Sequence, residues 1–306
     1  MVVSGPHHMS RLALAGILLC GAVLLETSCE NADAVAQFAS AATQALAQGP
    51  AVLSDIEESC VRERTERDPR DGLIPPNNDL IKTECKVFAD QTPRLLSDSQ
   101  ALTSYFTAIS QLASVGSTSA GKGGGDSAQG SGNSSGGESS GHKSGSSAKA
   151  SPAQDDVGAA KSIFTFLGNL AVSGYRSKHL DRDIKDHKND VDLAIGALIS
   201  VVENNYYTQL RTEQDASKTL FSRLLEGSSV PGPAVRLLIR DRWDEHMRLI
   251  DAKRQKAETY VKALKQIQSG GDKLASHSGQ LAAKDIPGLL QPHTAELGEL
   301  IPTLIH

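Results

Sequence analysis

The sequence predicts an all-α fold, an elongated helical bundle built on a long antiparallel helical hairpin. Its 306 residues include six Phe, five Tyr and one Trp, which is few aromatic residues for a β-sandwich or barrel. We find no segment in which apolar and polar residues alternate with the period of two that is typical of strands. Between Ile239 and Ile267, in contrast, a mostly apolar stripe recurs at alternating spacings of four and three residues, which indicates packed helices.

Residues 1–28 are expected to be a signal peptide. Arg11 precedes an apolar run from Leu12 to Leu25, and these 14 residues fall short of the roughly 20 that span a bilayer. The run is followed at once by Glu26-Thr27-Ser28-Cys29, where small residues are suited to cleavage. The segment therefore predicts export rather than a membrane-spanning helix.

The end of this segment resembles a bacterial lipoprotein signal, because a leucine pair lies just upstream of Ser28 and Cys29. The resemblance implies lipidation of Cys29 and attachment to a membrane through an N-terminal lipid. Glu30 then implies the bacterial cell envelope, on the periplasmic side of the outer membrane. Glu26 departs from the aliphatic residue of the pattern, so ordinary cleavage near residues 32–34 with secretion, or an uncleaved anchor, stays open.

Residues 29–115 are predicted to form an N-terminal helical region, with Thr92-Pro93 as a helix start. After Cys29 the chain holds two cysteines, Cys60 and Cys85. An exported chain meets an oxidising compartment, so we expect them to form a disulfide. A catalytic cysteine is the alternative, but no neighbouring histidine or helix start is present to lower a thiol pKa.

Residues 116–151 are predicted to be a disordered linker, since Gly and Ser supply 23 of these 36 positions. Just beyond it, residues 157–175 are the most apolar segment of the mature chain. Two interpretations stay open for this segment. It packs in the core on the helix before the linker, or it forms an apolar hairpin for membrane insertion, as in α-helical pore-forming proteins.

Residues 152–269 are predicted to form the long hairpin. Ser151-Pro152 begins it, Glu226-Gly227 and Pro233 flank its turn, and Gly270-Gly271 ends it. Heptad spacing assigns one seam to both helices. The residues of this seam are Ile195, Val202, Glu213, Ile239, Trp243, His246, Ile250, Ala257 and Leu264.

A turn centred near Ser229-Val230 also predicts the register of the two helices. Leu264 is expected beside Ile195, and His246 beside Glu213. A polar pair inside such a seam costs stability but fixes the register. The alternative for His246 and Glu213 is a proton-transfer or metal pair.

Residues 178–192 contain groups that could bind a metal ion, with His179, Asp183 and His187 spaced by four. Basic residues interleave with the carboxylates there, which favours a solvated helix face with ion pairs. We therefore expect no metal and no cofactor, and a transition-metal site is the alternative.

Residues 270–306 are predicted to be short helices that pack on the bundle.

Net charge of −5 argues against nucleic acid as a partner, and HExxH and CxxC motifs are missing. The sequence predicts no enzyme. It predicts an exported, lipid-anchored envelope protein that serves as a structural spacer or a scaffold for an unknown protein partner. The alternatives are a pore-forming protein and a metal-dependent enzyme.

Overall fold

The computed structural model confirms the all-α prediction. It describes residues 30–67, 78–118, 152–172, 180–226, 232–278 and 285–306, which are helical apart from short turns. A first helix covers residues 30–46. It is followed by α2 (Gly49–Arg67), α3 (Asn78–Glu84), α4 (Lys86–Thr118), α5 (Pro152–Val172), α6 (Leu180–Val201), the π-helical turn η3 (Val202–Tyr206), α7 (Tyr207–Glu226), α8 (Pro233–Ser276) and α9 (Ile286–Ile305).

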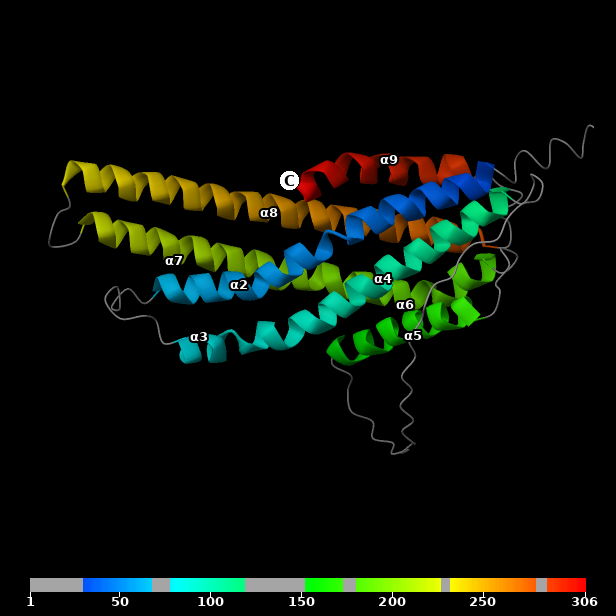
Figure 1. Cartoon of the computed structure of the whole chain (residues 1–306), viewed down its shortest axis with the longest axis horizontal. Coiled ribbons are helices and arrows are strands. Elements are labelled where there is room, and N and C mark those ends of the chain that lie inside the picture. The colour runs from blue at the N-terminus through cyan, green and yellow to red at the C-terminus, as the bar shows by residue number, and fades with distance from the viewer. Residues whose placement is uncertain (1–29, 68–77, 119–151, 173–179, 227–231, 279–284) are drawn as a thin grey trace, which may run out of the picture.

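The helices lie roughly along one axis and make an elongated bundle (Figure 1). The first helix and α2 run in succession along the bundle, and α4 returns beside them. The nearly continuous helix α6–η3–α7 runs beneath α8, while α5 covers α4 and α6, and α9 packs on α8. The hairpin of α7 and α8 extends past the other helices at one end.

One apolar core joins all the long helices. Its largest fully buried side chains come from the first helix, α2, α4, α5, α6, η3, α7 and α8. They include Phe38, Leu53, Leu102, Ile163, Leu198, Tyr206, Leu210 and Tyr260. Each helix therefore buries a stripe rather than all its sides, as expected of a bundle.

Two predicted helix boundaries are wrong, the start at Thr92-Pro93 and the end at Gly270-Gly271. α4 begins at Lys86 and continues through Pro93, and the Thr92 hydroxyl donates to the Phe88 carbonyl at 2.9 Å. α8 continues through Gly270 and Gly271 to Ser276. A Cβ on Gly270 would lie 2.4 Å from ring carbons of Phe38, so this glycine allows close helix packing and does not end the helix.

The π-helical turn has a reason in the sequence. Buried residues Leu198, Val202, Tyr206 and Leu210 follow one another at three successive spacings of four. Three turns of α-helix contain about 10.8 residues, so four-residue spacings drift off one face. A π-helical turn takes up the extra residue and keeps all four side chains on the core.

The apolar segment 157–175 lies mainly in α5, where Ala159, Ala160, Ile163 and Phe166 are buried and Phe164 is 39% exposed. α5 packs on α4 and α6, as the first of the two interpretations expects. Within the described part of the chain, no helix has the length and hydropathy needed to span a bilayer. The signal peptide, Cys29 and residues 119–151 of the expected linker lie outside the described residues, and α4 covers residues 116–118.

Candidate functional site

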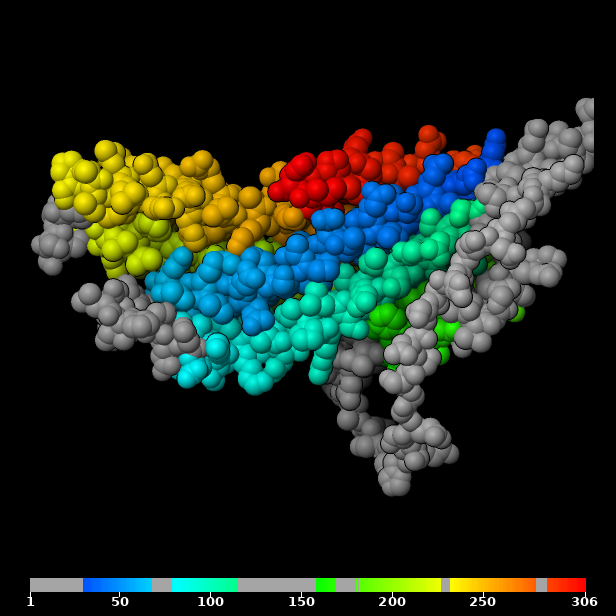
Figure 2. Space-filling view, in the orientation of Figure 1, coloured from blue at the N-terminus to red at the C-terminus, as the bar shows by residue number. Residues whose placement is uncertain are grey.

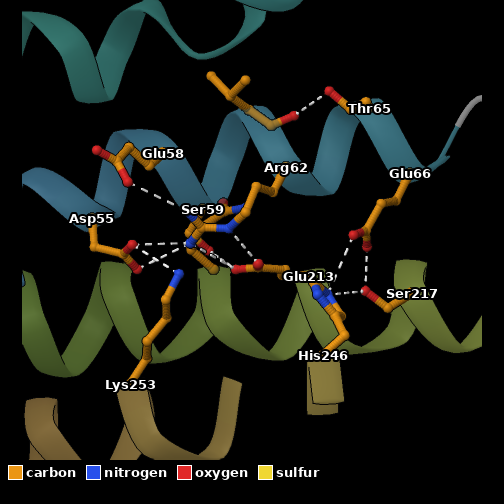
Figure 3. Close-up of polar contacts among 12 residues, drawn as sticks. Asp55, Glu58, Ser59, Arg62, Thr65, Glu66, Glu213, Ser217, His246 and Lys253 are labelled. Carbon is orange, nitrogen blue, oxygen red and sulfur yellow. Dashed lines mark hydrogen bonds and ion pairs between the residues drawn. The ribbon is translucent and has the colours of Figure 1, made fainter. Parts of the chain in front are cut away.

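Polar side chains gather where α2, α7 and α8 meet, and Figure 3 shows most of this polar junction. On α2 its members are spaced by four, three and four residues, so they share one helix face. The polar junction consists of Asp55, Ser59, Arg62 and Glu66 of α2, Tyr206 of η3, Glu213 and Ser217 of α7, and His246 and Lys253 of α8.

Glu213 is the most buried charged member, with no exposed surface. Its carboxylate accepts from Arg62 Nε at 2.6 Å, from Arg62 Nη2 at 3.3 Å and from the Ser59 hydroxyl. Burial alone would lower the pKa of Arg62, but hydrogen bonding to Glu213 and the charges of Asp55 and Glu213 raise it well above its ordinary value. Arg62 therefore stays charged and neutralises a carboxylate in the core.

Asp55, on the other side of Arg62, links α2 to η3 and α8. It accepts from Arg62 Nη2 at 3.0 Å, forms an ion pair with Lys253 Nζ at 2.9 Å, and accepts from the Tyr206 hydroxyl at 2.6 Å. Burial and the neighbouring Asp55 charge raise the pKa of Tyr206, so its hydroxyl remains a donor.

Glu66, Ser217 and His246 form the third part of the polar junction. His246 Nε2 lies 2.8 Å from Ser217 Oγ and 3.2 Å from Glu66 Oε1, and Ser217 also donates to Glu66. Burial raises the pKa of Glu66, although the Ser217 hydrogen bond and the charge of His246 oppose this. A serine, a histidine and a carboxylate are the components of a hydrolase triad, which is defined by the geometry of the hydrogen bonds between them.

That geometry does not support nucleophilic catalysis. In a triad the histidine takes the serine proton with one ring nitrogen and donates from the other nitrogen to the acid. Here Nε2 of His246 contacts both Ser217 and Glu66. Ser217 is also fully buried, so a substrate cannot reach its hydroxyl.

The contacts of the polar junction instead fix the register of the three helices. Three carboxylates face Arg62, Lys253 and His246, and each group meets a partner from another helix. Sliding one helix past another by a turn would leave Glu213 unpaired in the core and the half-buried charges without partners, which is costly. The junction therefore fixes how α2, α7 and α8 align.

The residues of the predicted hairpin seam divide into two groups. Ile195, Val202, Glu213, Ile250, Ala257 and Leu264 are buried, each with at most 1% of its surface exposed. Ile239, Trp243 and His246 are half-buried and lie nearer the turn. Trp243 packs edge-on against Phe221, with 5.1 Å between ring centroids.

The predicted pairing of His246 with Glu213 is wrong. His246 contacts Ser217, one helical turn farther along α7, and Glu213 bonds to Ser59 and Arg62 of α2. Glu203 meets Lys265 at 2.7 Å, whereas the expected turn centre would place it near Lys253. Sequence reasoning considered two helices, and α2 is the third that takes up the polar groups of the seam.

Of the three residues singled out for a metal, His179 lies outside the described residues. Asp183 is 8% exposed, and burial raises the pKa of its carboxyl. His187 stacks on Phe166 and lies 3.7 Å from Asp190. In the ranges that the structure describes, no three His, Cys, Asp or Glu side chains gather as metal ligands would.

The expected disulfide links Cys60 of α2 to Cys85, which lies between α3 and α4. Both cysteines are buried and pack with Ile81. Cys60 directly follows Ser59, so the bond holds the chain before α4 against the α2 turn that carries the polar junction.

Sequence reasoning missed the α2 part of the polar junction, although the signal was present. Asp55, Ser59, Arg62 and Glu66 form a polar stripe one residue away from the apolar positions Ile56 and Cys60. A polar stripe on an amphipathic helix is usually solvated, and only the packing of α7 on it reveals burial. No family model, curated protein or solved structure matches this chain.

Proposed function

We propose that this chain is a lipid-anchored envelope protein that acts as a rigid spacer and presents its helical hairpin to a partner. One observation carries the proposal. The first helix, which begins one residue after Cys29, starts at one end of the bundle, whereas α7 ends and α8 begins at the other end (Figure 1). A lipid on Cys29 would therefore hold the hairpin away from the anchoring membrane.

The length and rigidity of the bundle support this role. α8 alone contains 44 residues and extends for about 66 Å at 1.5 Å per residue. The polar junction fixes the alignment of three helices, and the Cys60–Cys85 bond holds the start of α4 against α2. These features suit a spacer that holds the hairpin at a fixed distance from the first helix.

Lipidation is tested by growing cells with radiolabelled fatty acid. Label should enter the wild-type protein and a Cys20→Ala variant, which alters the other cysteine of the signal, but not Cys29→Ala. Equal labelling of Cys29→Ala and Cys20→Ala, or no labelling of any form, would contradict the anchor.

Rigidity is tested separately by spin-label distances in the purified exported protein. Gln37 of the first helix and Ser222 of α7 are exposed and lie toward opposite ends, so Gln37→Cys and Ser222→Cys provide label sites. A spacer predicts one narrow, long distance. A broad distribution would show that the hairpin swings freely, and the spacer role would fail even if Cys29 were lipidated.

A further inference from the structure

The free end of the hairpin carries an unusual concentration of exposed apolar side chains. We call residues 219–226 of α7 and 233–240 of α8 the hairpin tip. Within it Leu224, Val235, Leu237 and Leu238 are 46%, 50%, 62% and 60% exposed. The hairpin tip projects beyond α2 and α3 (Figure 2). Solvent exposure of four large apolar residues so close together indicates a surface with a partner.

The apolar residues do not lie on a single side of α8. At about 100° per residue, Leu238 is displaced by 60° from Val235, and Leu237 lies on nearly the opposite side from Val235. Ile239, four residues after Val235, lies about 40° from it and is half-buried, so Val235, Leu238 and Ile239 share one side of α8. A protein groove buries one stripe of a helix, whereas a helix end that is apolar on two opposite sides suits a surrounding apolar medium.

The charged residues of the hairpin tip indicate the charge of the surface that it would meet. The tip carries Arg223, Arg236 and Arg240 against Glu226, although the whole chain has a net charge of −5. An anionic surface would therefore attract this end and repel the rest of the chain. Arginine side chains can also extend from a partly inserted helix toward headgroups.

From this arrangement we propose that the hairpin tip docks end-on into the surface of an anionic lipid bilayer. The eight α8 residues of the tip rise about 12 Å, which is comparable with the roughly 5–10 Å depth of interfacial apolar insertion. Leu237 and Leu238 would enter the acyl boundary, and Arg240 would meet lipid phosphates. The inference does not depend on lipidation of Cys29.

The test uses the full chain in a Trp243→Phe background, since Trp243 is its only tryptophan. A new tryptophan is placed by Leu237→Trp at the tip or by Val87→Trp on α4, where Val87 is 53% exposed. Vesicles contain phosphatidylcholine and phosphatidylglycerol with brominated acyl chains, which quench fluorescence on contact. We expect at least half of the fluorescence to be quenched for Leu237→Trp and little for Val87→Trp. Binding through the N-terminus alone would quench neither and would overturn the proposal.

A second pair of variants tests the apolar contact itself. Leu237→Ser with Leu238→Ser should weaken vesicle binding through the hairpin tip at least tenfold. Leu80→Ser with Val87→Ser removes two apolar residues elsewhere that are nearly as exposed, and it should leave vesicle binding unchanged. Binding should also fall several-fold when phosphatidylglycerol is omitted or salt is raised to about 0.5 M.

Two outcomes would overturn the proposal. If the wild type sediments as a dimer and the Leu237→Ser, Leu238→Ser variant as a monomer, the tip is an interface between copies of this chain. If both serine pairs weaken vesicle binding equally, the contact is not specific to the tip. Because all four positions are exposed, the variants should keep the wild-type helical content, which circular dichroism checks.

Discussion

The two halves of α8 carry the same sequence pattern in different surroundings. In the half after Ile250, Ala257 and Leu264 have no exposed surface, because α8 packs there on α6 and α9 as well as on α2. In the half before it, Ile239 and Trp243 continue the same spacing but are half-buried beside α7 alone. Heptad spacing thus identifies which side of a helix faces a partner, and the number of partners decides how deep the burial is.

The largest difference between the packed part of the bundle and the hairpin tip should come from removing a charge partner. Arg62→Ala leaves Glu213 buried without its cation, which is expected to cost about 3–5 kcal/mol of unfolding free energy. The matched control is Arg242→Ala near the tip, whose pair with Glu245 is exposed and should contribute less than about 1 kcal/mol. Urea unfolding measures both, and equal losses would mean that the polar junction does not hold the helices.

A smaller contrast is expected for apolar contacts. Leu264→Ala empties a fully buried site and should cost about 2–4 kcal/mol. Ile239→Ala removes three carbons that are only half-buried, so about 1 kcal/mol is expected from roughly 0.8 kcal/mol per buried methylene. The same urea measurements compare them. A loss for Ile239→Ala as large as that for Leu264→Ala would show that the tip is packed as firmly as the rest.

Two adjacent glycines sharpen the comparison within the buried half. Gly270→Ala forces a methyl group against Phe38 and should cost about 1–3 kcal/mol. Gly271→Ala meets no atom within 4 Å and should add about 0.5–1 kcal/mol, because alanine favours the helix. Thermal unfolding should therefore move in opposite directions for the two variants. Stabilisation by both would contradict the close approach of the first helix.

The smallest effect is expected from pH, through Glu66 of α2, which contacts His246 in the half of α8 before Ile250. Burial raises the pKa of Glu66 above its ordinary value of 4.5. Between pH 4.5 and the folded pKa, Glu66 is therefore protonated in the folded chain and ionised in the unfolded chain. That contribution to stability is present below pH 4.5 and is lost as pH rises through the folded pKa. Glu66→Gln cannot titrate, so its stability relative to wild type should increase between pH 4 and pH 7. Urea unfolding at each pH checks the sign, with exposed Glu58→Gln as the control for loss of one charge.

Local patterns predicted much of this fold. Pro152 begins α5, Glu226 ends α7 and Pro233 begins α8, each where turn and cap residues indicated. The Cys60–Cys85 pair followed from cysteine number and export. These features depend on a few neighbouring residues or on chemistry alone, so no tertiary structure was needed.

The features that the sequence did not predict depend on contacts between distant segments. Gly270 is required by Phe38, and Pro93 is tolerated because α4 is held by packing on α2, α5 and α6. Glu213 pairs with Arg62 across 151 positions of sequence. Periodicity assigns a side chain to a helix face, but it does not identify the helix that covers that face.

The contact of Phe38 with Gly270 also constrains how the sequence can change over time. The ring occupies the space where a side chain at 270 would lie, since a Cβ there would be only 2.4 Å from ring carbons. A larger residue at position 270 is therefore acceptable only where position 38 becomes smaller. In homologous chains we expect the two positions to vary together, with phenylalanine opposite glycine or a smaller aliphatic residue opposite alanine, even though 232 positions separate them.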